Sequence, residues 1–139
     1  MVHALRRAGS YLRRGGTLIS IRPHRTWRPS IVIVAGRSRV PVATLLNTAF
    51  EVNLSAAESA LKRVVDEGSF TLAGVRAARY RIYLDRPSQI RTYLELINPP
   101  RPRFPRGGRA RLEAIWNTAP RGARVEVTES LIVNGLRRP

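Results

Sequence analysis

The hydrophobic pattern at the start of the chain predicts a helix followed by a strand. Residues 4–13 place apolar side chains at i, i+3 and i+7, the spacing of one buried stripe on a helix. The stripe consists of Leu5, Ala8 and Leu12. Gly15 and Gly16 then predict the helix end, because glycine readily takes the left-handed conformation of a helix C-cap. Residues 17–21 (TLISI) are almost continuously apolar, which is typical of a strand buried on both faces.

The next segment predicts a loop and a β-hairpin. Residues 22–29 contain two prolines, which restrict the residues before them to extended conformations. Residues 31–35 and 40–46 then form two strands around a turn at residues 36–39. Pro41 has no N–H to donate, so we expect the second strand at a sheet edge.

A helix and a long strand are predicted for the middle of the chain. Ser55 and Glu58 have the S-x-x-E spacing of a capping box, which predicts a helix over residues 56–67 that Gly68 stops. Its apolar face consists of Ala57, Leu61, Val64 and Val65. Residues 71–84 follow as a strand of alternating polarity. The expected core face of that strand carries Ala78, Tyr80, Ile82 and Leu84.

The last third of the chain predicts two helices, a connector and a strand. Pro87 opens a helix with apolar residues at helical spacing. Residues 98–108 (NPPRPRFPRGG) have four prolines and predict an extended connector. A short helix ends near residues 119–120, and residues 124–133 form the last strand. Glu129 shares a face with the apolar residues of that strand, so we expect a partner, a bulge or a local exit from the core.

Composition adds charge to this picture. The 139 residues fit a single domain, residues 1–139, with 98–108 as an internal connector. The net charge is +16, and Lys62 is the only lysine among the 25 basic residues. Such a charge attracts nucleic acid, although a GC-rich genome, which favours arginine codons over lysine codons, explains it equally well. The chain has no cysteine and only short apolar runs, which favours a soluble, cytoplasmic protein.

Candidate chemistry is sparse in the sequence. His3 and His24 are far apart and lack cysteine or acidic neighbours, so no metal site is expected, and no catalytic residue is assigned. His24 follows the strand at residues 17–21, and open α/β sheets place their ligands beyond the carboxyl ends of strands. The substrate-pocket candidates are therefore Pro23, His24 and Arg25, with a solvent-exposed loop as the alternative reading.

In order, these motifs resemble the C-terminal half of a class I S-adenosylmethionine-dependent methyltransferase. In that family a helix ends in Leu-x-Pro-Gly-Gly before an apolar fifth strand, and residues 12–16 (LRRGG) and 17–21 match this arrangement. Arg14 stands where the family has proline. Pro23-His24 matches the family's histidine-proline loop, and residues 31–46 match its hairpin insertion. Residues 65–70 match the family's Val-x-x-Gly-x-Phe helix end, and residues 75–84 and 124–133 match its last two strands.

The resemblance implies a fold and a function. The fold is α/β, a partial Rossmann-like methyltransferase sheet holding the last three strands, with flanking helices on both faces and a β-hairpin insertion. In the family's sheet, the strand matching residues 17–21 lies between the fourth and seventh strands. The implied function is the substrate-side part of a methyltransferase, without cofactor-binding residues and inactive until an N-terminal half supplies the S-adenosylmethionine site.

Two other functions stay open from the sequence. One is a stand-alone basic module that binds nucleic acid, and the other is a structural or oligomerisation subunit. The family's fourth strand has no counterpart here, so one edge of residues 17–21 is expected to be unpaired. An unpaired edge invites another chain, and we expect either a homodimer or a missing N-terminal half as the partner.

Overall fold

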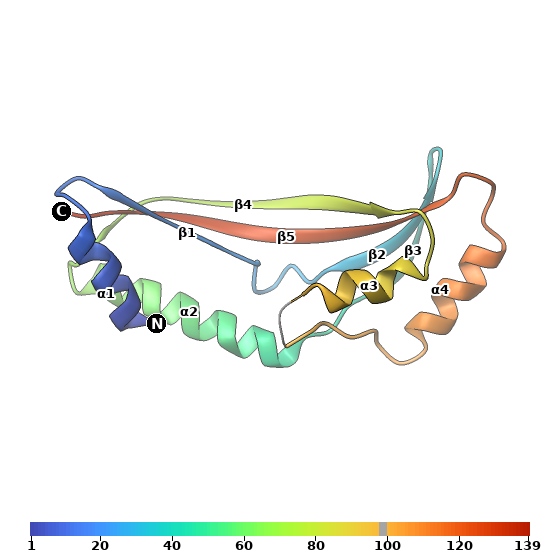
Figure 1. Cartoon of the computed structure of the whole chain (residues 1–139), viewed down its shortest axis with the longest axis horizontal. Coiled ribbons are helices and arrows are strands. Elements are labelled where there is room, and N and C mark those ends of the chain that lie inside the picture. The colour runs from blue at the N-terminus through green and yellow to red at the C-terminus, as the bar shows by residue number, and fades with distance from the viewer. Residues whose placement is uncertain (98–99) are drawn as a thin grey trace. The chain divides into compact units, whose positions relative to one another are not determined.

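The computed structural model describes residues 1–97 and 100–139 and has the expected α/β class (Figure 1). Its elements in chain order are α1 (Val2–Tyr11), β1 (Thr17–Arg22), β2 (Ser30–Ala35), β3 (Ser38–Thr44), α2 (Thr48–Asp66), β4 (Thr71–Leu84), α3 (Gln89–Glu95), α4 (Gly108–Asn117) and β5 (Arg124–Arg137). The strands are hydrogen-bonded in the order β1-β5-β2-β3, and β4 also pairs with β5. The pairs β1·β5, β2·β3 and β2·β5 are antiparallel.

The described residues form two compact units. Unit 1 consists of Met1–Arg25, Glu51–Ala78 and Leu131–Pro139, and unit 2 consists of Thr26–Phe50 and Arg79–Ser130. The strands β4 and β5 contribute residues to both units. A single domain over residues 1–139 stays a prediction.

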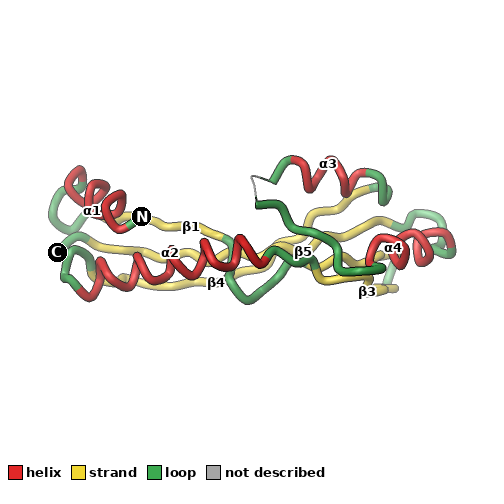
Figure 2. The backbone as a smooth tube through the Cα atoms, turned by 90° about the horizontal axis from the view of Figure 1, so that it is seen from below, coloured by secondary structure: helices red, strands yellow, loops and turns green. Residues whose placement is uncertain are grey.

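In unit 1, α1 and α2 pack on the same face of the strands (Figures 1 and 2). β1 pairs with the second part of β5, from Thr17 opposite Arg137 to Arg22 opposite Ile132. The core consists of Leu61, Val64, Phe70 and Leu136, with Val2, Leu5, Leu12, Leu18 and Val65 packed against it. The expectation of helices on both faces is therefore wrong for this unit.

The prediction that β1 is buried on both faces is also wrong. Its residues alternate between exposed and half-buried, and Ile19 and Ile21 are 54% and 67% exposed. The reason is that Leu18 faces α1 and α2, whereas no described helix covers the opposite face. A run of apolar residues therefore did not imply burial, because burial requires a covering layer on each side.

In unit 2, β2 lies between β3 and the first part of β5, as its two registers show. In the core of unit 2, inward-facing residues of these strands pack against residues of α3 and α4. The buried core residues are Ile31, Ile33, Val42, Leu45, Ile90, Leu94, Leu112, Val125 and Val127. The predicted hairpin is confirmed, but its turn is shorter than expected because Ala35 already pairs with Ser38. β3 is the last strand of the order, so Pro41 lies on an edge strand as predicted.

The predicted start of α2 is wrong by several residues. The helix begins at Thr48, and the side-chain Oδ1 of Asn47 accepts a hydrogen bond of 3.3 Å from the N–H of Phe50. This side-chain acceptor satisfies a free donor of the first turn, which places Ser55 inside the helix and removes its capping role. The helix end is confirmed, because Gly68 has φ +73°.

The strands and the connector also depart from expectation. β4 is exposed on both faces through Arg81, so Ala78 and Tyr80 are not core residues, whereas Ile82 and Leu84 pack against the core of unit 2. β5 continues to Arg137, beyond the predicted end at residue 133. Residues 98–99 of the predicted connector lie outside the described residues. In the described part of the connector, residues 100–108, Arg103 forms an isolated β-bridge with Leu46.

Burial of Leu136 predicts a measurable loss of stability on truncation. Leu136 is fully buried between the strands and helices of unit 1. We expect Leu136→Ala to lower the free energy of unfolding by about 2–5 kcal/mol, because the substitution removes buried methyl groups and leaves a cavity. Leu96→Ala is the matched control, since Leu96 is 80% exposed. Denaturant unfolding measures both, and equal losses would contradict the assignment of this core.

Candidate functional site

Two arginines at the carboxyl end of β1 share one carboxylate. The Nε–H of Arg25 donates to Oε2 of Glu58 at 2.9 Å, and Nη2 of Arg22 lies 3.7 Å from Oε1 of Glu58. The Nη1–H of Arg22 also donates to Oδ1 of Asn134 at 2.5 Å. We call these four residues the Glu58 cluster.

Strand pairing and helix packing position the members of the Glu58 cluster. Ser20 pairs with Asn134, and Arg22, two residues further, pairs with Ile132. Diagonal neighbours on one face of an antiparallel pair lie within reach of long side chains, so Arg22 meets Asn134. Glu58 lies one turn before Leu61 on the face of α2 that packs on the strands, which directs its carboxylate toward them.

A pocket of about 240 Å³ adjoins the Glu58 cluster. Its lining combines polar groups with an apolar wall and consists of Arg22, Glu58, Leu61, Lys62, Val65, Leu72, Asn134 and Leu136. The Nε–H of Arg22 is buried and has no hydrogen-bond partner among the described residues. A buried donor without a partner is costly, so this N–H is the group available to a bound acceptor.

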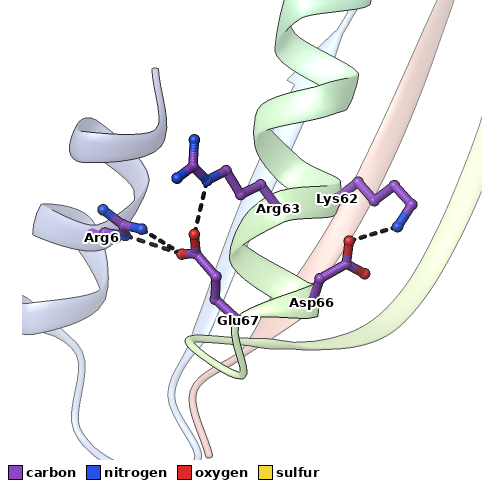
Figure 3. Close-up of polar contacts among 5 residues, drawn as sticks. All are labelled: Arg6, Lys62, Arg63, Asp66 and Glu67. Atoms are coloured by element: carbon purple, nitrogen blue, oxygen red, sulfur yellow. Dashed lines mark hydrogen bonds and ion pairs between the residues drawn. The ribbon is translucent and has the colours of Figure 1, made fainter.

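The electrostatics of the pocket favour an anionic or acceptor-rich ligand. Two guanidinium groups face the single carboxylate of Glu58, which leaves one positive charge in excess. Lys62 does not add to this excess, because its Nζ lies 2.5 Å from Oδ2 of Asp66 (Figure 3). The pocket can therefore hold and orient a ligand, but it brings together no pair of groups for acid–base chemistry.

The sequence-predicted candidates lie beside this pocket rather than in its wall. Arg25 is part of the Glu58 cluster, His24 is half-buried in the same loop, and Pro23 is exposed. Sequence reasoning missed Arg22, Glu58 and Asn134. The sequence did contain a signal for Glu58. It precedes Leu61 by three residues and Val65 by seven, a spacing that puts its carboxylate on the apolar face of the helix.

Unit 2 holds one buried and one half-buried carboxylate, Glu126 and Glu129, that have structural partners. Glu126 is fully buried and accepts hydrogen bonds of 2.9 and 2.5 Å from Arg39, which lowers the pKa of Glu126. Sequence reasoning did not single out Glu126. Glu129 accepts a hydrogen bond from the hydroxyl of Tyr93, which confirms the expected partner, and burial raises the pKa of Glu129. Satisfied pairs of this kind fix packing, so we assign neither carboxylate to a site.

Comparisons with protein-family models, with curated proteins and with solved structures give no match. Within the part of the chain that the structure describes, no group of three or more His, Cys, Asp or Glu residues is placed to hold a metal ion. None of the described helices is both long and apolar enough to cross a membrane.

Removing the shared carboxylate tests the Glu58 cluster. The side chain of Arg22 is only 12% exposed, so Glu58→Ala leaves a buried guanidinium without its counter-charge. We expect a loss of about 1–3 kcal/mol in the free energy of unfolding, because Arg25 loses a charge-assisted hydrogen bond and the mostly buried Arg22 loses its nearest counter-charge. Glu95→Ala is the control, because the exposed pair of Glu95 with Arg91 is expected to contribute at most about 0.5 kcal/mol. Equal losses for the two variants in denaturant unfolding would contradict a stabilising role of Glu58 beside Arg22.

Proposed function

We propose that this chain is the substrate-side, C-terminal part of a class I S-adenosylmethionine-dependent methyltransferase with a partial Rossmann-like sheet. The observation that carries the proposal is the antiparallel pairing of β1 with β5. In the family, the seventh strand, which β5 resembles, flanks the fifth strand, which β1 resembles. The two strands are far apart in sequence, and their pairing supports the proposal.

The Glu58 cluster supplies the substrate side of this proposal. It lies at the carboxyl end of β1, where open α/β sheets place their ligands. Arg22 offers a buried N–H donor to an acceptor atom of the substrate, while Glu58 holds Arg25 beside it. These contacts bind and orient a methyl acceptor, and we assign no catalytic role to any residue of the chain.

The residues of this chain do not fit the cofactor. The family's cofactor site uses a glycine-rich loop that follows a strand, whereas Gly15 and Gly16 precede β1. Their backbone groups are also engaged: the N–H of Gly15 donates to the carbonyl of Arg138, and the N–H of Arg138 donates to the carbonyl of Gly16, both at 2.8 Å. S-adenosylmethionine therefore requires an N-terminal half from another polypeptide or a longer gene product.

A structural or oligomerisation role is the second candidate function, and the uncovered face of unit 1 favours it. Ile19, Ile21 and Val75 are each more than half exposed. Among the described strands, β1 pairs only with β5, so its outer edge has unpaired backbone groups. An apolar strand with an open edge favours pairing with another chain, and a second copy related by a two-fold axis is the simplest partner.

The methyltransferase proposal predicts that the chain binds S-adenosylmethionine only when a cofactor-binding half is joined to it. We expect calorimetric titration of the isolated chain with S-adenosylmethionine to be flat. A chimera that carries the cofactor-binding half of a class I methyltransferase ahead of residue 1 is expected to bind the cofactor with a dissociation constant in the micromolar range. The cofactor half alone is the control, and it is expected to bind at least tenfold more weakly.

Two results would contradict the proposal. The first is micromolar binding of the cofactor by the isolated chain, which would require a site built from residues that we treat as structural. The second is a chimera that is folded by circular dichroism and still binds no cofactor.

The second candidate predicts a dimer that depends on β1. We expect light scattering at micromolar concentration to give twice the mass of the chain. Ile19→Lys should reduce the mass to that of a monomer, because it places a charge in the contact. Val52→Lys adds the same charge on α2 at a residue that is 69% exposed, and this control should remain a dimer. A monomeric wild-type protein would refute the second candidate.

A further inference from the structure

Unit 1 contains a second pocket that the proposed function does not use. Its volume is about 540 Å³, and it is lined by Arg6, Gly9, Ser10, Arg14, Ser69, Phe70, Arg138 and Pro139. These residues come from α1, from the turn after α1, from the turn between α2 and β4, and from the end of the chain after β5. Among the described residues that line it, three side chains carry a guanidinium and none is acidic. We call it the Arg14 pocket.

A backbone clamp brings Arg14 and Arg138 to the same pocket. The residues next to Arg14, Gly15 and Gly16, form two hydrogen bonds of 2.8 Å with the backbone of Arg138. Gly15 has φ +76°, a conformation that glycine takes without strain. The side chain of Arg138 also donates to the carbonyl of Leu12. The backbone next to Arg14 and the side chain of Arg138 are thus held in place by contacts within the fold.

Arg6 is held on the pocket wall by an ion pair with α2. Its Nη2 lies 2.5 Å from Oε2 of Glu67, and Glu67 also accepts a hydrogen bond of 2.8 Å from Nε of Arg63 (Figure 3). The hydrogen bond from Arg6 is the main cause of the lowered pKa of Glu67. Because Glu67 serves two guanidinium groups, it offsets only part of the positive charge at the pocket.

The guanidinium of Arg14 makes no hydrogen bond or ion pair with the described residues. It is exposed and lies in a pocket that already holds two other guanidinium groups. Like charges gathered in this way raise the free energy of the empty pocket, and an anion lowers it. Arg14 is also the residue that departs from the proline of the methyltransferase motif.

We propose that the Arg14 pocket binds a phosphate group. The guanidinium fork matches the oxygen geometry of phosphate and forms paired, charge-assisted hydrogen bonds with it. Small-ligand pockets have volumes of roughly 300–1,000 Å³, so this pocket has room for a molecule with more than one phosphate. The phosphate comes either from a free phosphorylated molecule, such as a nucleoside diphosphate, or from the backbone of a nucleic acid. This site is independent of the proposed methyltransferase role.

The experiment is a calorimetric titration of the full chain with inorganic pyrophosphate at 0.15 M salt. We expect saturable binding of one pyrophosphate per chain, weakened at least tenfold in Arg14→Gln and in Arg138→Gln. Arg13→Gln is the matched control, because it removes the same charge at the neighbouring exposed residue, which does not line the pocket. Its affinity is expected to stay within twofold of the wild type. Arg14 is exposed, so Arg14→Gln is expected to keep the circular dichroism spectrum of the wild type.

The same variants identify the source of the phosphate. Displacement of pyrophosphate from the wild-type chain by ADP, with direct ADP binding weakened at least tenfold in Arg14→Gln, supports the site with a free nucleotide as its ligand. The same two results with a short DNA duplex in place of ADP support the site with backbone phosphate as its ligand. The proposal is overturned if pyrophosphate shows no saturable binding at this salt concentration. It is also overturned if Arg13→Gln weakens binding as much as Arg14→Gln, because the attraction would then reflect only net charge.

Discussion

The antiparallel pairing of β1 with β5 is the contact on which the rest of unit 1 depends. It joins residues from the two ends of the chain, and closing so long a loop costs only slightly more entropy than closing one of half the length. The pairing sets Leu18 opposite Leu136, and α1 and α2 pack over these two side chains. Without it, the apolar stripe of α1 would lose part of the surface that it covers, because Leu18 and Leu136 belong to that surface together with residues of α2.

The same pairing places two basic pockets at opposite ends of β1. Arg22, the last residue of the strand, reaches Asn134 in the Glu58 cluster, whereas Gly16, just before the strand, bonds to Arg138 in the Arg14 pocket. Six strand residues span roughly 20 Å at about 3.3 Å per residue, so the two pockets are separate sites. A ligand in one therefore leaves the other accessible.

The excess of arginine over acidic residues shapes both pockets. With 9 acidic and 25 basic side chains, some carboxylates serve two arginines, as Glu58 and Glu67 do. Guanidinium groups left outside such pairs, of which Arg14 is one, keep their full charge for a ligand. The distribution of the few carboxylates, more than the total charge of +16, decides where an anion is attracted.

Local patterns in the sequence determined the class of most elements, because helix periodicity and hairpin turns depend on neighbouring residues. The predicted glycine stop of the first helix is wrong, because α1 ends at Tyr11 and Leu12 is already extended, ahead of Gly15 and Gly16. Gly68 ends α2 as predicted, and the hairpin with Pro41 on its edge strand is present. Even so, Asn47 rather than Ser55 caps α2. The sequence did not predict this, because both side chains suit a cap and the sequence pattern does not rank them. Which faces are buried was decided only by the tertiary structure, because burial depends on the layer that packs against a strand. From the sequence alone, the loop with His24 and Arg25 was a candidate site, because it follows a predicted strand. Arg22, Glu58 and Asn134 come from distant parts of the chain, and only strand register and helix packing brought them together.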